Sequence, residues 1–286
     1  MASLRQIRRR MKSIENIHEI TKAMEMIAAF RFKKAENRFT RSRSYFLEIE
    51  RLISNLSRSA VELKHPLFEV REVKKKALVV VTADKGLCGS YNTNLLRRTT
   101  DWLRENKAFE TALIPVGKVG AETLRKRGAP VVFSYPEKTK ADFPMARQIT
   151  DKLTSLFLEK KADSVEILYM TYHGAASGKI RLMPFLSLSR LLEKSDAEAQ
   201  GADYIYEPDA AGIFPALLAR FLEGELFGVL LESLTSEYSA RMVAMKQASD
   251  NGEEVLDSLK VLRNKTRQAT ITRELSEIVS GASVLV

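Results

Sequence analysis

The chain has 286 residues, of which 45% are hydrophobic and 29% are charged, and its formal net charge is +10. This composition is typical of an ordered protein and excludes a disordered one. The single cysteine, Cys88, excludes an internal disulfide framework and a cysteine-rich metal site. No apolar run approaches the roughly 20 residues of a membrane span, so we expect any membrane association to run through a partner or the protein surface.

The positive charge is concentrated at the start of the chain. Residues 1–60 contain 14 Lys and Arg against 6 Asp and Glu, whereas residues 209–286 contain 8 against 11. A basic segment implies an acidic partner, which is nucleic acid, anionic lipid or an acidic protein surface. The Arg-rich start also has the look of a transit peptide, but Glu15, Glu19 and Glu25 follow in the same helical pattern, so we interpret it as mature structure.

Two long helices are predicted, over residues 1–60 and 209–286. All eight prolines lie between Pro66 and Pro215, and no glycine precedes Gly86, so helix breakers are absent from most of both segments. Apolar residues recur there every three or four positions and form one narrow stripe on each helix. The natural partner of each stripe is the other, which predicts a coiled coil of irregular pitch. Asp250–Gly252 indicates a local bend in the second helix.

An α/β domain of Rossmann-like type is predicted between them, at residues 75–190. β-branched runs such as Ala77–Thr82 are typical of buried parallel strands, and they alternate with helical patterns. The expected strands are 77–82, 112–116, 131–135, 164–172 and an edge hairpin strand at 179–186, and the expected helices are 94–105, 119–126 and 145–160.

One loop of this domain has the position of a phosphate-binding loop. Asp84–Tyr91 follows the first strand and precedes a helix. Its sequence, DKGLCGSY, fits neither GxGxxG nor GxxxxGK[ST], and Gly117–Gly120 is a weaker match still. We therefore favour a structural tight turn, with Cys88 as a small buried side chain, over a phosphate site or a catalytic thiol.

No catalytic residue, cofactor or metal site is predicted. His18, His65 and His173 have no metal-ligand spacing, and no carboxylate pair suggests a general acid and base. The basic cluster from Arg5 to Lys12 has three interpretations: a solvated helix face, a contact for acidic protein loops, or a nucleic-acid grip. The apolar stripe runs straight through the cluster, which favours the first two.

Several longer motifs carry a family resemblance. They are Ile20–Ala29 (ITKAMEMIAA), Asp84–Asn92 (DKGLCGSYN), Arg241–Gly252 continuing to Arg263–Leu285, and the shorter Lys64–Glu69 and Tyr204–Asp209. In this order, at both ends of the chain, they closely resemble the gamma subunit of bacterial F-type ATP synthases. Residues 100–200 add only a compatible α/β pattern.

The resemblance implies a rotor shaft without catalytic activity of its own. The terminal helices would form an antiparallel coiled coil inside a hexamer of alternating alpha and beta subunits. The α/β domain would sit beside the epsilon subunit on a membrane ring of c subunits. Proton-driven rotation of the ring would then drive ATP synthesis in beta, with one copy of the shaft per complex, peripheral on the cytoplasmic face of the bacterial inner membrane.

Motif positions also imply particular contact residues. For the alpha/beta hexamer they are Met24, which matches the contact with the acidic lever loop of beta, together with Arg267, Gln268 and Thr272 on the last helix; for the ring and epsilon side they are Tyr204, Tyr206 and Glu207.

Two alternatives remain open on sequence alone. A basic coiled coil could bind nucleic acid, which a salt-dependent DNA titration would reveal. An α/β nucleotide-binding enzyme with helical appendages would bind nucleotide through Gly86 and Gly89. The sequence does not indicate whether the coupling ion is a proton or sodium.

Overall fold

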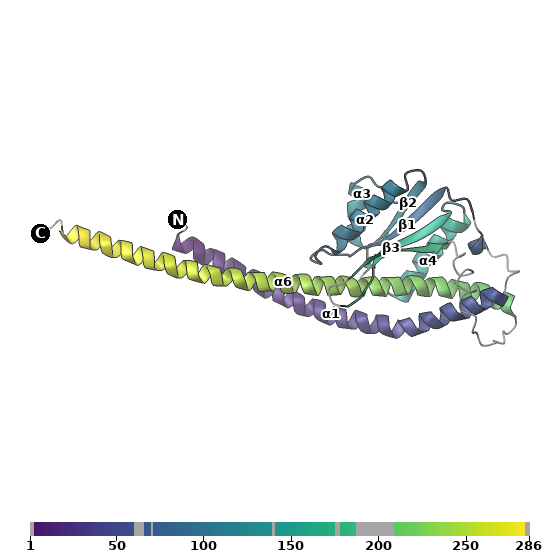
Figure 1. Cartoon of the computed structure of the whole chain (residues 1–286), viewed down its shortest axis with the longest axis horizontal. Helices are drawn as coiled ribbons and strands as arrows, with labels where there is room; N and C mark the ends of the chain where they lie inside the picture. The colour runs from purple at the N-terminus through teal and green to yellow at the C-terminus, as the bar shows by residue number, and fades with distance from the viewer. Residues whose placement is uncertain are drawn as a thin grey trace. The chain divides into compact units, whose positions relative to one another are not determined.

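The computed structural model describes residues 3–59, 66–69, 71–138, 141–174, 178–186 and 209–283. The chain divides into two compact units, Met1–Ala28 with Met242–Val286, and Ala29–Arg241. Two long helices, α1 (Leu4–Ser59) and α6 (Ala210–Ser283), contribute to both units (Figure 1). The domain boundaries expected at 60, 75–190 and 209 stay predictions.

Both long helices begin at a polar side chain that binds free backbone N–H groups. Ser3 Oγ accepts from the N–H of Gln6 at 3.3 Å, and Gln6 Oε1 accepts from the N–H of Ser3 at 3.0 Å. This reciprocal arrangement is a capping box. Asp209 Oδ1 accepts from the N–H of Gly212 at 2.6 Å at the start of α6. These caps explain why the helices start where they do.

The first compact unit pairs the beginning of α1 with the end of α6. Ile7 and Met11 are buried together with Leu259, and the Cβ of His18 lies beside Gly252. Because residue numbers rise along one helix as they fall along the other, the helices are antiparallel. The pairing predicted from the two apolar stripes is confirmed. The helix is unbroken through Asp250–Gly252, where a local bend was expected.

In the second unit, α1 and α6 pack together through an aromatic ring of α1 that lies against two glycines of α6. A Cβ added to Gly224 would lie 2.9 Å from Cδ1 of Phe46, and one added to Gly228 would lie 3.4 Å from Cδ2. The Phe46 ring also meets Phe227 edge to face, with centroids 6.0 Å apart. The two glycines therefore leave a notch in α6 for one aromatic side chain of α1, which sets the register of the pair.

A four-stranded sheet forms the centre of the second unit. The strands are β1 (Lys75–Val81), β2 (Glu110–Val116), β3 (Ser164–Met170) and β4 (Ile180–Leu186), in the order β2-β1-β3-β4. The pairs β1–β2 and β1–β3 are parallel, and β4 is antiparallel to β3 at the edge. The predicted α/β domain with an edge hairpin is thereby confirmed. Among the described residues, the other helices are α2 (Tyr91–Glu105), α3 (Lys118–Lys126), α4 (Phe143–Leu158) and the 3-10 turn η1 (Pro66–Phe68).

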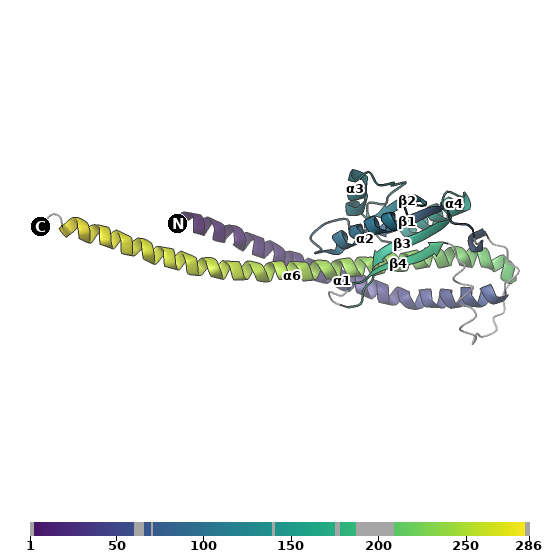
Figure 2. The same ribbon diagram turned by 45° about the horizontal axis from the view of Figure 1, so that its top comes forward.

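The sheet has helices on both faces, so its strands are buried on two sides. Leu78 and Val80 of β1 point into a core shared with α2 and α3, whereas Ala77, Val79 and Val81 point into a core shared with α4, α6 and α1. Figures 1 and 2 show the same layers, with α2 and α3 on one face and α6 running along the other. Alternate residues of β1 thus hold different helices, and α6 belongs to the core of the sheet as well as to the helix pair.

The strand predicted at 131–135 is wrong as a continuous strand. Only isolated parallel bridges are present there, between Leu113 and Val131 and between Val116 and Tyr135. The N–H of Leu113 donates to the Pro130 carbonyl at 2.8 Å and the N–H of Tyr135 donates to the Pro115 carbonyl at 3.0 Å. Pro115 of β2 has no N–H to supply the rung between them, so the ladder is interrupted.

Candidate functional site

The carboxyl end of β1 is where a Rossmann-like fold would hold a phosphate group, and here the chain's own side chains occupy it. The N–H of Ala83 donates to Asn92 Oδ1 at 2.9 Å. The N–H of Lys118 donates to Asp84 Oδ1 at 3.1 Å, so a carboxylate already lies at the start of α3. Because Asn92 binds the N–H that follows β1 and Asp84 places a carboxylate at the start of α3, where a phosphate would otherwise be attracted, this end of the sheet acts as a structural junction.

The glycines near this junction are explained by close packing. A Cβ on Gly117, whose φ is +103°, would lie 2.4 Å from the carbonyl oxygen of Thr82, and one on Gly120 would lie 2.6 Å from Thr82 Oγ1. The Thr82 hydroxyl accepts from the N–H of Gly120 at 3.0 Å. In the loop itself, Leu87 and Gly89 have φ values of 61° and 58°. The preferred interpretation of Asp84–Tyr91 as a tight turn agrees with this geometry.

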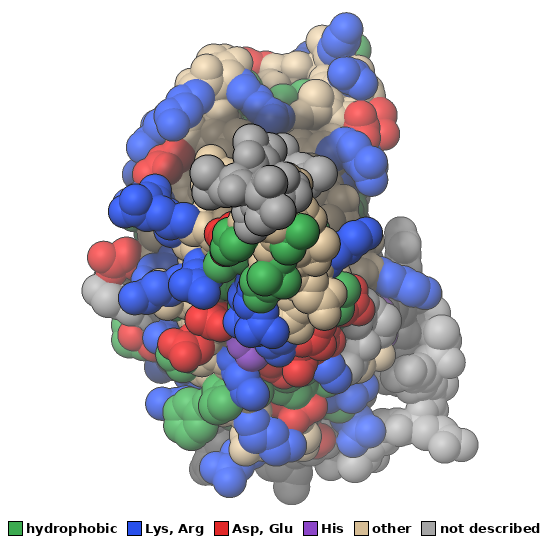
Figure 3. Space-filling model, turned by 90° about the vertical axis from the view of Figure 1, so that its left-hand side faces the viewer, with side chains coloured by type: hydrophobic (Ala, Val, Ile, Leu, Met, Phe, Trp, Pro, Cys, Tyr) green, Lys and Arg blue, Asp and Glu red, His purple; other side chains and the backbone are tan. Residues whose placement is uncertain are grey.

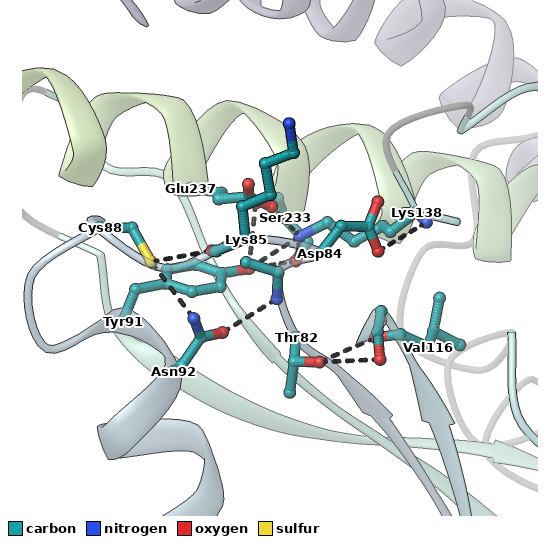
Figure 4. Close-up of polar contacts among 12 residues, drawn as sticks. Thr82, Asp84, Lys85, Cys88, Tyr91, Asn92, Val116, Lys138, Ser233 and Glu237 are labelled. Atoms are coloured by element: carbon teal, nitrogen blue, oxygen red, sulfur yellow. Dashed lines mark hydrogen bonds and ion pairs between the residues drawn. The ribbon is translucent and has the colours of Figure 1, made fainter. Parts of the chain in front are cut away.

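A buried ion pair joins this junction to helix α6. Lys138 Nζ lies 2.6 Å from Glu237 Oε2, and the two side chains are 0% and 1% exposed. The N–H of Lys138 donates to Asp84 Oδ1 at 3.1 Å, so the segment that carries the lysine is also tied to the loop after β1. Figure 4 shows these groups converging beneath α6. The pair therefore links the sheet side of the unit to the long helix.

Arg241 extends the link one helical turn further along α6. Its Nη1 lies 2.8 Å from Glu237 Oε1, so the carboxylate has a cation on each oxygen. Its Nη2 donates to the carbonyls of Lys85 and Gly86 at 3.1 and 3.3 Å. One guanidinium thus binds both the helix and the loop after β1, a use of its several donors that a lysine could not match.

Two hydroxyls complete the arrangement. The Tyr91 hydroxyl lies 2.6 Å from Ser233 Oγ and is close enough to donate to the Ser233 carbonyl at 3.1 Å. Lys138 Nζ donates to the Tyr91 hydroxyl at 3.2 Å. Ser233, Glu237 and Arg241 are spaced by four residues, so they lie on one face of α6. We call Lys138, Glu237, Arg241, Tyr91 and Ser233 the junction cluster.

The electrostatics of the cluster favour charged Lys138. Burial by itself would lower the pKa of this lysine, but the Glu237 carboxylate and the Tyr91 hydroxyl outweigh it and raise the pKa above its usual value. Burial raises the pKa of Tyr91, which keeps its hydroxyl protonated. The cluster is therefore an ion pair with a neutral phenol beside it at physiological pH.

Cys88 is a structural side chain, as predicted. It is buried, its Sγ accepts from Asn92 Nδ2 at 3.3 Å, and burial raises the pKa of its thiol. A nucleophilic cysteine requires the opposite shift. Of the three histidines, His18 packs beside Gly252, and His65 lies outside the described residues. Within the described ranges, no three His, Cys, Asp or Glu side chains are grouped so as to hold a metal.

The contact residues implied by the resemblance fall into two sets. Met24 is half-buried on α1, and the other three hexamer positions are exposed on α6, all within the first compact unit. The three on α6 are Arg267, Gln268 and Thr272. The ring-side residues Tyr204, Tyr206 and Glu207 lie outside the described residues.

Apolar side chains are also exposed on the end of α6. They are Val261, Leu262, Ile271, Leu275, Ile278 and Val279. Figure 3 shows hydrophobic side chains at the surface among many Lys, Arg, Asp and Glu side chains. In the part of the chain that the structure describes, no helix has both the length and the apolarity to cross a membrane.

Sequence reasoning missed the junction cluster. Lys138 lies in the stretch EKTKADF, which has the composition of a solvated loop, and nothing in its spacing points to a partner 99 residues away. Glu237 stands between Leu234 and Tyr238 in the apolar stripe, and an acid at that position was the available signal. A charged residue inside a buried stripe requires a partner.

Comparison with known proteins identifies the family. A family model described as ATP synthase matches residues 3–285. The ATP synthase gamma chain of Herminiimonas arsenicoxydans is 41% identical over 293 residues, and that of Cupriavidus necator is 36% identical over 293 residues; in both, the match covers 100% of each chain.

Solved structures agree. A chain from the central stalk and c-ring of the Tetrahymena thermophila mitochondrial ATP synthase matches with a TM-score of 0.62 and 26% identity, over 80% of this chain and 99% of that one. A chain from the Euglena gracilis mitochondrial ATP synthase has the same fold, with a TM-score of 0.69 and 20% identity, over 99% of this chain and 94% of that one. The chain therefore belongs to the ATP synthase gamma-chain family and is a non-catalytic subunit of the central stalk, the rotor of F-type ATP synthases.

Proposed function

We propose that this chain transmits torque between a membrane ring of c subunits and a catalytic hexamer of alternating alpha and beta subunits, so that proton flow is coupled to ATP synthesis in beta. The observation that carries the proposal is that relatives named as gamma chains match over the whole length of this chain. A subunit of this kind needs no active site of its own, and the end of β1, where Asn92 and Asp84 bind backbone N–H groups, suits that role.

The proposed hexamer contacts are Met24, Arg267, Gln268 and Thr272. Exposure of the last three supports the assignment, as do the exposed apolar side chains on the same helix. Isolated, such apolar groups would be a liability for solubility, which a surrounding sleeve of protein removes. The basic side chains of α1 would guide acidic loops of beta without locking to them, because exposed ion pairs contribute only about 0–1 kcal/mol each.

The ring side of the proposal rests on motif position. Tyr204, Tyr206 and Glu207 would lie near the c-ring and the epsilon subunit, because they fall in a segment that matches the family there. We place one copy of the chain in each complex, as a peripheral subunit on the cytoplasmic face of the bacterial inner membrane. Its bacterial relatives support this location.

Site-directed cross-linking within the purified membrane complex tests the contacts. A tagged chain with Cys88→Ser would carry Thr272→Cys or, as a matched control, Glu122→Cys on α3, which is also exposed. After treatment with a short sulfhydryl-to-amine cross-linker, we expect the first variant, and not the control, to be captured by alpha or beta. If the tagged chain purified without alpha, beta and c subunits, the proposed partners would be wrong. If the Thr272→Cys variant were cross-linked to epsilon alone, the assignment of Thr272 would be wrong.

A further inference from the structure

We propose that the junction cluster is the joint through which torque passes between the α/β domain and helix α6. The inference rests on the proposed rotor function, because only a rotating shaft must carry load between these parts. Family similarity does not by itself indicate which residues transmit the torque, whereas the contacts of Lys138, Glu237 and Arg241 do.

The cluster brings three separate pieces of the α/β domain to one face of α6. Lys138 comes from the segment before α4, Tyr91 from the start of α2, and the carbonyls of Lys85 and Gly86 from the loop after β1. Each binds within the two helical turns that include Glu237. A force on any of these pieces therefore reaches the same short stretch of the helix.

The ion pair limits how far α6 can slide or turn against the α/β domain. Hydrophobic burial has no direction, so an apolar helix face can slide or turn against a sheet while most of its burial is kept. The Lys138–Glu237 pair has one favourable geometry, since separating its ions leaves uncompensated charge in a dry interior. Such a pair adds little to stability over an apolar replacement, but it holds the helix at one rotation and one register.

The position of the cluster along the helix fits a load-bearing joint. Arg241 is the last residue of the second compact unit, and from Met242 onward α6 belongs to the first. Side chains of α6 are all buried from Ser233 to Ser239, whereas most are exposed beyond residue 260. The contacts of Glu237 and Arg241 therefore lie at the end of the part of α6 that belongs to the second unit.

A variant that lacks both charges of the Lys138–Glu237 pair tests whether the pair transmits torque or only contributes to stability. The variant Lys138→Met/Glu237→Leu has similar volume and leaves neither ion of the pair behind, while Arg241 loses its carboxylate and keeps its bonds to the carbonyls of Lys85 and Gly86. Ile167→Val, a mild change in buried β3, is the control for a general loss of packing. Each variant would be compared with the unaltered complex in inside-out membrane vesicles, where proton pumping, followed by quenching of an acridine dye, is divided by ATP hydrolysis in the same vesicles.

We expect the double variant to assemble and hydrolyse ATP but to lose most of its pumping per ATP, and the Ile167→Val complex to keep the unaltered ratio. The proposed joint would be wrong if the double variant kept the unaltered ratio of proton pumping to ATP hydrolysis, or if Ile167→Val lost as much of this ratio as the double variant. Should the double variant not assemble, Tyr91→Phe decides, because it removes only the hydroxyl that binds Lys138 and Ser233. We then expect a smaller loss of the ratio, and no loss would overturn the inference.

The two proposals fail in different ways. If vesicles with the unaltered chain hydrolyse ATP without pumping protons, the proposed function is wrong. If they pump normally and the junction variants do too, the rotor function stands and only the joint is wrong.

Discussion

The burial of helix α6 differs sharply between the two compact units of the chain. From Ser233 to Ser239 every side chain is buried, between α1, the sheet and the loop after β1. Among residues 260–280 nearly all are exposed, and in the described part of the first unit a small buried cluster joins Leu259 to Ile7 and Met11 of α1. One continuous helix is thus packed into a core along one part and exposed along the other, as expected of a shaft that is fixed at one end.

The difference predicts where single changes are costly. A change in the junction cluster disturbs a buried, ion-paired site, and a change on the exposed part of α6 disturbs little. Chemical denaturation of the purified chain measures this contrast.

Glu237→Ala should be the most damaging. It leaves Lys138 buried without its carboxylate and Arg241 without its helix partner, so we expect unfolding free energy to fall by about 3–5 kcal/mol. The measurement is the urea midpoint, with the Lys138→Met/Glu237→Leu variant beside it. A double variant as unstable as the single one would contradict the ionic explanation.

Alkaline pH should weaken the second unit through the same cluster. The pKa of Lys138 is raised on folding by Glu237, so its contribution is complete below its unfolded pKa of about 10.4 and is lost as pH rises through the folded value. Tyr91 acts in the same direction, since burial raises its pKa and the unfolded phenol ionises first. Arg241, also in contact with Glu237, stays charged throughout.

The corresponding measurement is unfolding free energy from pH 8 to 11. We expect a steeper decline above about pH 10 in the unaltered chain than in Lys138→Met/Glu237→Leu, because tyrosine and lysine side chains titrate there. Parallel curves would show that the cluster does not cause the decline.

Gly224→Ala tests the notch that receives Phe46. The new Cβ would lie 2.9 Å from the ring, so overpacking should cost about 1–3 kcal/mol. Gly228→Ala is the matched control, because its Cβ would lie 3.4 Å away and alanine favours the helix. Equal effects of the two changes would mean that the ring does not set the register.

Gly252→Ala should stabilise the first unit slightly. The helix is unbroken at Gly252, and a Cβ there would meet His18 at 3.4 Å, an ordinary contact. The expected gain is about 0.5–1 kcal/mol from helix propensity. Hydrogen exchange of residues 242–260 would localise the effect, and a loss of protection would instead support the bend expected from the sequence.

Arg273→Ala should change least. Its ion pair with Glu277 at 3.0 Å is exposed on α6, and pairs of this kind contribute about 0.3–0.5 kcal/mol. A shift in midpoint comparable to that of Glu237→Ala would remove the contrast between the two parts of the helix.

Local patterns predicted most of the elements. Absence of proline and glycine, together with apolar residues every three or four positions, indicated both long helices, because these features act within one turn. β-branched runs located β1, β2 and β3 to within about two residues, the usual error of element boundaries. The strand at 131–135 failed because its ladder depends on a donor that Pro115 of the neighbouring strand lacks, and neighbours in a sheet are not adjacent in sequence.

Periodicity and motifs are properties of neighbouring residues, so they were sufficient to indicate the family, the two apolar helices and the α/β type of the domain between them. The folded chain was needed to show which helix covers which face of the sheet, where Phe46 packs against α6, and that Lys138 and Glu237 meet in the interior. The last two outcomes depend on contacts between residues about 100 or more positions apart, where packing and desolvation, rather than local preference, select the partners.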